Sequence, residues 1–118
     1  MIWRAQPEAL LQRTLIQHFV LRRQPGWLLW STPNASKRSP RQGAELKRQG
    51  MVPGVGDLSL VRTSDCRYHE LELKTEKGRL SPAQRERQNV LLGAGVPYEA
   101  AWGLDDAIDV LKAWGVIR

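Results

Sequence analysis

Residues 54–84 have the sequence GVGDLSLVRTSDCRYHELELKTEKGRLSPAQ, and this stretch decides the fold that we expect for the chain. Residues 58–62 and 67–74 have the apolar alternation of strands, and the Thr-Ser-Asp sequence at 63–65 supplies turn residues between them. The two segments therefore predict a β-hairpin. A glycine-rich segment leads into the first strand and places Asp57 at its start.

The end of the same stretch predicts a helix. Ser81 is a preferred N-cap residue, Pro82 suits the first turn, and Gln84 stands at the capping-box position. We expect this helix to continue to about Leu92, because Gly93 follows and glycine commonly ends helices. Helical structure is therefore expected directly after the hairpin.

Strand geometry gathers charged side chains on one face of the hairpin. Successive strand side chains point to opposite faces of a sheet. The residues of the second strand that share one face are Tyr68, Glu70, Glu72 and Lys74. The hairpin also brings the start of the first strand, with Asp57, to the end of the second strand. Two carboxylates and one lysine are thus expected to converge.

The rest of the chain predicts further helices and strands. Before the hairpin we expect a helix over 7–23, a strand over 27–30, an exposed basic loop over 31–43 and a short helix over 44–49. After it we expect a strand over 98–102 and a closing helix over 105–114. This order predicts an α/β fold in which helices pack on a small mixed β-sheet.

Length and composition limit the class of protein. A chain of 118 residues suits a single domain, 1–118, with one core. It has 42% hydrophobic and 25% charged residues, as soluble globular proteins do. No apolar run suits a membrane span and no secretory signal is evident, so we expect a cytoplasmic protein without a membrane partner. The formal charge of +6 favours an anionic partner, most obviously nucleic acid.

The converging acids indicate metal chemistry. Two carboxylates that share a site repel each other, and Mg²⁺ or Mn²⁺ relieves this repulsion through oxygen ligands. Such an ion polarises a phosphodiester and activates an attacking water, so Asp57 and Glu72 predict metal-dependent phosphodiester hydrolysis. Lys74 would stabilise negative charge, and whether it also acts as a base stays open. Taken alone, the Glu-x-Lys pattern is more typical of a solvated strand face than of a catalytic site.

The combination of motifs is more specific than any one of them. GVGDLSLV followed by ELELKTEKGRLSPAQ resembles the virus-type replication-repair nuclease (VRR-NUC) domain, a branch of the PD-(D/E)xK nuclease superfamily. The resemblance extends from Pro7 to Trp114 and implies a restriction-endonuclease-like fold and a metal-dependent nuclease. The matching residues are Glu8, Gln12, Asp57, Glu72, Lys74, Gly78 and Gln84.

The resemblance also implies roles for individual residues. Asp57 and Glu72 would bind the metal, and the carbonyl of Leu73 would add a ligand. Lys74 would complete the catalytic set. The chain departs from the family at Gly56, where proline is usual, and glycine frees a backbone angle that proline fixes. We therefore expect Asp57 to be less rigidly placed than in the family.

Three polar residues have two interpretations each. By the resemblance Glu8 would contribute to the metal site from the first helix, although a first-turn glutamate also favours the helix dipole. Gln84 would orient a water or a phosphate as part of the catalytic set, although its capping-box position also explains it. Glu70 shares the face of Glu72, and we expect it to pair with a cation rather than bind the metal.

Basic residues around the site predict contacts with DNA phosphates, which give affinity but no sequence preference. These residues are Lys37, Arg38, Arg41, Lys47, Arg48, Lys77 and Arg79, together with Arg85 and Arg87. The basic loop is equally well explained as a solvated loop. No separate recognition module fits in the remaining residues, so we expect selection by DNA shape, with branched or flapped DNA as substrate.

The resemblance also bears on assembly. Small stand-alone members of the family resemble Holliday-junction resolvases that act as homodimers, and two-fold pairing would supply two cuts. We therefore expect a homodimeric, structure-selective endonuclease from a bacterial or phage setting, with one or two of the five tryptophans anchoring the dimer. The alternatives are a flap-type nuclease, a non-catalytic DNA-binding module and a protein-interaction adaptor.

Overall fold

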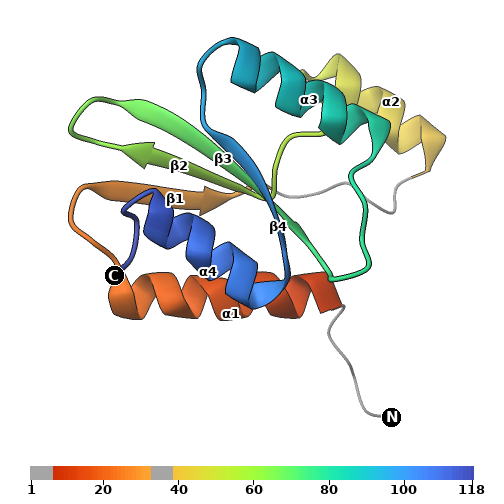
Figure 1. The fold of residues 1–118 in the computed structure, drawn as a ribbon. Coiled ribbons are helices and arrows are strands. Elements are labelled where there is room, and N and C mark those ends of the chain that lie inside the picture. Colours follow the sequence, from red (N-terminus) through yellow and green to blue (C-terminus); the bar gives the residue numbers. More distant parts are fainter. Residues whose placement is uncertain (1–6, 33–38) are drawn as a thin grey trace.

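The computed structural model describes residues 7–32 and 39–118, which form a β-sheet with helices on both faces (Figure 1). The helices are α1 (Pro7–Arg22), α2 (Pro40–Arg48), α3 (Pro82–Gly93) and α4 (Gly103–Ala113). The strands are β1 (Trp27–Ser31), β2 (Leu58–Arg62), β3 (Arg67–Lys74) and β4 (Tyr98–Trp102). The expected α/β class, with a small mixed sheet flanked by helices, is confirmed.

The sheet has the strand order β1-β2-β3-β4. β2 is antiparallel to both β1 and β3, whereas β4 runs parallel to β3 because α3 forms the crossover between them. The predicted hairpin is confirmed, and its register pairs Ser59 with Glu70 and Leu58 with Leu71. Asp57, one residue before β2, therefore lies beside the last residues of β3.

The apolar core lies on the sheet face that α1 and α4 cover (Figure 1). Alternate residues of β2 and β3 point to this face, and they meet residues spaced by four along each helix. The buried members of this cluster include Leu15, Phe19, Leu58, Leu60, Leu71, Leu73, Ala101, Ala107 and Leu111. His69 also belongs to this face, where its ring contacts those of Trp27 and Trp114 edge to face. In the described part of the chain, no helix is long and apolar enough to cross a membrane.

The opposite face of the sheet is polar where α3 covers it. Glu70, Glu72 and Tyr98 are buried there between β3, β4 and α3. The same face is open over β1, where Leu28 and Trp30 are exposed. The alternation predicted for β3 is thus confirmed, and it separates an apolar core from a layer of buried polar groups.

One element differs substantially from its prediction. α2 begins at Pro40, within the segment predicted as an exposed loop over 31–43, and not at residue 44. The Ser39 side chain accepts a hydrogen bond from the N–H of Gln42, and the Gln42 side chain accepts one from the Ser39 N–H. This capping box stabilises a helix start that the basic composition concealed. The other element ends agree with expectation or differ by one or two residues.

Candidate active site

The structure brings Asp57, Glu72 and Lys74 together at one edge of the sheet. Asp57 Oδ2 accepts a 2.7 Å hydrogen bond from the backbone N–H of Leu73, which ties the start of β2 to the end of β3. Lys74 Nζ lies 3.6 Å from Glu72 Oε1, and the Lys74 side chain is 12% exposed. The predicted convergence of two acids and a lysine is therefore present.

Glu72 is the most perturbed acid of this group. Its side chain is 2% exposed, and burial together with repulsion from the Asp57 carboxylate raises its pKa to about 8, even though Lys74 acts in the opposite direction. Its Oε2 atom is buried without a hydrogen-bond partner among the described residues. A carboxylate in this environment favours either a proton or a bound cation.

Gln84 forms hydrogen bonds through both ends of its side-chain amide. Its side-chain oxygen accepts a hydrogen bond from the N–H of Ser81 and so completes the capping box of α3. Its Nε2 donates a 2.9 Å hydrogen bond to Glu72 Oε1. The capping interpretation is confirmed, whereas the catalytic role of Gln84 stays a prediction. The start of α3 is thereby tied to the candidate catalytic carboxylate.

Glu70 lies next to this group in a separate network. It is fully buried and accepts hydrogen bonds from the Gly56 N–H at 2.9 Å, the Tyr68 hydroxyl at 2.6 Å, and Arg87 Nε and Nη2 at 3.1 and 3.0 Å. Burial alone would raise the pKa of Glu70, but the bonds from Arg87, Tyr68 and Gly56 outweigh it and lower the pKa below the ordinary value. The expectation that Glu70 pairs with a cation is confirmed.

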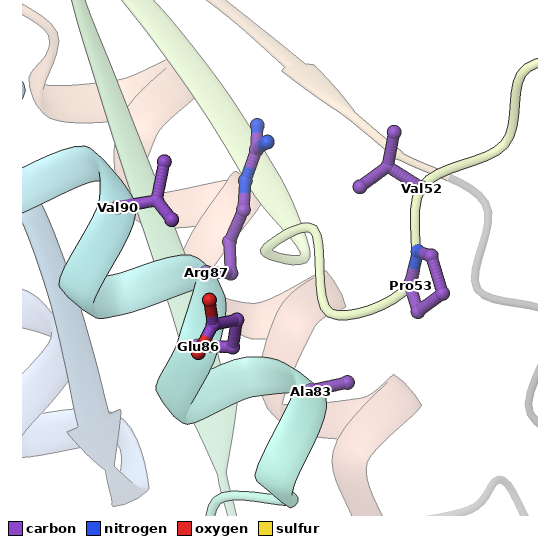
Figure 2. Close-up of a pocket in the computed structure, with 6 residues that line it drawn as sticks. All are labelled: Val52, Pro53, Ala83, Glu86, Arg87 and Val90. Carbon is purple, nitrogen blue, oxygen red and sulfur yellow. The ribbon is translucent and has the colours of Figure 1, made fainter.

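Arg87 is the cation that pairs with Glu70, and its contact with DNA phosphates stays a prediction. Figure 2 shows its side chain extending from α3 toward the strands. The stem of Arg87 also borders a shallow, mainly apolar hollow of 370 Å³ between α3 and the segment before Asp57. The other residues lining this hollow are Val52, Pro53, Ala83, Glu86 and Val90. Asp57, Glu72 and Lys74 do not line it, so the hollow is distinct from the carboxylate site.

Gly56 has a different physical role from the one predicted. It is buried and is not among the glycines with positive φ, so the site does not use its conformational freedom. A Cβ atom there would lie 2.8 Å from Glu70 Cγ and 2.9 Å from the carbonyl oxygen of Leu71. Proline would bring the same clash and would lack the N–H that binds Glu70. The segment before Asp57 is therefore held closely and is not loosely placed.

Sequence reasoning missed two residues that border the site. The Tyr98 hydroxyl is buried without a hydrogen-bond partner in the described part of the chain, and burial and the charges of Glu72, Glu70 and Asp57 raise its pKa. Trp102 pairs in register with Lys74, and its indole N–H donates a 2.7 Å bond to the carbonyl of Gly78. Only the parallel pairing of β4 with β3 reveals either position.

The structure also explains why the motif residue at position 78 is a glycine. A Cβ atom at this position would lie 3.3 Å from the carbonyl oxygen of Thr75 and 3.4 Å from both Cβ and Cδ of Lys74. Glycine therefore leaves room for the lysine stem. Gly78 thus lies beside the Lys74 stem, and the Trp102 indole binds the carbonyl of Gly78.

The remaining predicted residues are less closely connected to the carboxylates. Glu8 is exposed on the first turn of α1, and the described residues contain no cluster of three or more His, Cys, Asp or Glu side chains suited to a metal. The exposed basic residues are Arg41, Lys47 and Arg48 on α2 and Lys77 and Arg79 before α3. Lys37 and Arg38 lie outside the described residues. DNA contact by this set stays a prediction.

A small mixed sheet with an aspartate before one strand and Glu-x-Lys at the end of the next defines a nuclease of the PD-(D/E)xK type. A sequence model of the VRR-NUC domain matches residues 3–104, and the chain belongs to this family. No curated protein matches the sequence significantly.

Two solved structures support the fold. One, named "VRR_NUC domain protein", has 20% identity and a TM-score of 0.74 and covers 98% of this chain and 99% of its own. Another, named "VRR_NUC domain", has 17% identity and a TM-score of 0.60 and covers 92% and 97%. At these identities the likeness establishes the fold.

Proposed function

We propose that this chain is a divalent-metal-dependent DNA endonuclease that cuts branched DNA, with the Holliday junction as its substrate and the homodimer as its active form. The observation that carries the proposal is the pair of adjacent carboxylates, Asp57 and Glu72, beside Lys74. Such a pair with a neighbouring ammonium group suits metal-dependent phosphodiester hydrolysis better than binding alone, because two adjacent carboxylates repel a phosphate unless a cation lies between them.

The residues present fit Mg²⁺ or Mn²⁺. Glu72 Oε2 is a buried acceptor without a partner among the described residues, and Asp57 lies close enough to raise the pKa of Glu72. The N–H and C=O groups of one strand residue point to the same side, so the carbonyl of Leu73 faces Asp57, as its N–H does. We propose Asp57, Glu72 and Leu73 as ligands and Glu8 as a further one. The bound ion would supply positive charge to the scissile phosphate and lower the pKa of a water.

The chain's own residues then perform the remaining tasks. Lys74 would place an ammonium group beside the position of the phosphate and stabilise the charge of the transition state there. Gln84 holds Glu72 in one orientation through its amide N–H. The Leu73 N–H holds Asp57 in the same way. These two bonds keep both carboxylates in place before substrate arrives.

Substrate choice would come from shape and charge. The exposed basic residues of α2 and of the segment before α3 would contact phosphates on both sides of the cut. One chain carries one site, so a symmetric four-way junction requires two copies related by a two-fold axis to cut two strands. The homodimer follows from this requirement.

The test compares cleavage of a four-way junction, a flap and a linear duplex with Mg²⁺ or Mn²⁺ for the native chain, Asp57→Ala and Lys74→Ala. Asp65→Ala is the control, because Asp65 is an exposed turn residue that pairs with Arg62. We expect symmetric junction nicking that Asp57→Ala and Lys74→Ala abolish and Asp65→Ala retains. Cleavage of the flap alone would identify a flap nuclease, and binding without metal-dependent cleavage would identify a DNA-binding module. Weak DNA binding at physiological salt would favour the adaptor.

A further inference from the structure

The open part of the polar sheet face carries an exposed aromatic surface. Trp30 is 46% exposed and Leu28 is 55% exposed, both on the edge strand β1. Trp30 pairs in register with Ser59, and the register pairs Ser59 in turn with Glu70. Directly paired residues share a sheet face, so Trp30 lies on the same face as Glu70 and Glu72.

Direct contacts connect this surface to the candidate active site. The Trp30 ring lies 6.4 Å from that of Tyr68, measured between centroids, and the two planes are inclined by 48°. The Tyr68 hydroxyl donates to Glu70, which accepts the Gly56 N–H directly before Asp57. Trp30 is therefore the outer end of a contiguous series of side chains that leads to the site.

The separation between Trp30 and Asp57 suits a nucleic-acid strand. The Thr32 N–H donates a 2.9 Å bond to the carbonyl of Asp57, so the strand pairing continues to this point. Trp30 stands two residues before Thr32. The rise along the strand and the distance between neighbouring strands therefore place the Cα atom of Trp30 roughly 8 Å from that of Asp57. Stacked nucleotides rise about 3.4 Å each, so this distance spans about two of them.

The size and charge of the surface favour a nucleobase over a protein partner as its ligand. One exposed indole flanked by one leucine matches the footprint of a nucleobase, whereas a stable protein interface needs about 800 Å² on each partner. Every base has a π-face that stacks on an aromatic side chain. The formal charge of +6 favours the polyanion that carries such bases. A base inside an intact duplex is stacked and paired already, so it is not available to Trp30.

We infer that Trp30, supported by Tyr68 and Leu28, is a stacking site for one unpaired nucleobase of the substrate, about two nucleotides from the phosphate that is cut. This inference rests on the proposed nuclease function and deepens it. It makes an unpaired nucleotide beside the cut a determinant of substrate choice. A four-way junction would offer such a base where pairing opens at its branch point, and a flap would offer one in its single-stranded arm.

The test measures binding separately from cleavage. The probe is a flap oligonucleotide with 2-aminopurine, a fluorescent adenine analogue that stacking quenches, at the unpaired position next to the branch. Binding is measured in EDTA for the native chain, Trp30→Phe and Trp30→Leu, with a fully paired duplex as the second ligand. Leu21→Ala is the control, because Leu21 is an exposed apolar residue on α1, away from this sheet face. A thermal melt of each variant establishes that it is folded.

We expect the native chain, Trp30→Phe and Leu21→Ala to bind the flap and quench the probe. Trp30→Leu keeps an apolar cover but lacks the π-face, so it should lose the quench and bind the flap roughly tenfold more weakly, with little change for the duplex. Unchanged quenching in Trp30→Leu, or equal loss on flap and duplex, overturns the inference. So does a shift of Trp30→Leu from dimer to monomer in sedimentation without any loss of quenching, because Trp30 would then bind a second copy.

The two proposals fail in different ways. If the native chain quenches the probe through Trp30 but cuts no DNA with Mg²⁺ or Mn²⁺, the stacking site stands and the nuclease function fails. If metal-dependent cleavage depends on Asp57 while Trp30→Leu binds as the native chain does, the nuclease function stands and the stacking site is wrong.

Discussion

The backbone N–H of Gly56 donates a 2.9 Å hydrogen bond to the buried carboxylate of Glu70. The next residue, Asp57, accepts the N–H of Leu73. Two bonds, one to the backbone before Asp57 and one to its side chain, thus fix the candidate catalytic acid against β3. A close-packed glycine thus holds the backbone before Asp57 in place, and this arrangement leads to testable predictions.

Gly56→Ala should destabilise the protein. The added Cβ would meet Glu70 Cγ at 2.8 Å and the Leu71 carbonyl oxygen at 2.9 Å, and the backbone of β3 has little freedom to move away. We expect a loss of about 1–3 kcal/mol in the free energy of unfolding, measured by urea denaturation. Gly43→Ala on α2 is the control, because nothing lies within 4 Å of its Cβ. Equal stability of the two variants would contradict the close packing of Gly56 against Glu70 and Leu71.

Arg87→Leu should destabilise the protein more strongly. It leaves the Glu70 carboxylate fully buried without its cation. Removing one partner of a buried ion pair costs about 3–5 kcal/mol, and because Arg87 is partly exposed we expect a loss of about 3 kcal/mol by denaturation. Arg85→Leu, on an exposed position of the same helix, should change stability little. A small effect at Arg87 would mean that water or another cation reaches Glu70.

Gln84→Glu should reduce cleavage with only a small effect on folding. The variant keeps the oxygen that caps α3 but loses the N–H that binds Glu72, and it adds a like charge beside that carboxylate. Gln42→Glu is a matched control, since Gln42 forms the same capping box on α2 with Ser39. We expect a lower kcat for Gln84→Glu and none of this loss for Gln42→Glu. Equal activities would limit Gln84 to capping.

The stability of the metal-free protein should depend on the protonation of Glu72. Its pKa rises from the ordinary value of 4.5 to about 8 in the folded state, so the folded chain binds more protons than the unfolded chain between these values. The stabilisation is complete below pH 4.5 and is lost as the pH rises toward 8. The slope approaches about 1.4 kcal/mol per pH unit.

Glu72→Gln isolates this effect. The variant cannot titrate at this position, so the difference in unfolding free energy between the native chain and Glu72→Gln should change across this pH range, as measured by urea denaturation in EDTA. Other titrating groups, such as His69, contribute to both proteins and cancel in the difference. A difference that stays constant with pH would show that Glu72 has an ordinary pKa in the folded chain.

Much of the fold could be predicted because its signals are local. The hairpin followed from strand alternation and turn residues, and the start of α3 followed from Ser81, Pro82 and Gln84. The same capping signal is present at Ser39, Pro40 and Gln42, but it was not recognised within a basic segment. The predictable part of the candidate site was the convergence of Asp57, Glu72 and Lys74, because two strands and one turn determine it.

By itself, the sequence determined the order of helices and strands, the face on which Glu70 and Glu72 lie, and the family. The element order and the face depend only on neighbouring residues, because helices and strands have fixed periods. The family depends on motifs that can be read along the chain. The tertiary structure alone decided the partners of the buried groups: Arg87 for Glu70, Gln84 for Glu72, and the Gly56 N–H for Glu70. It also decided that Trp30 is exposed on the same face as the acids. These pairings depend on how α3 crosses β3 and on the strand register, which side-chain packing across the whole domain sets.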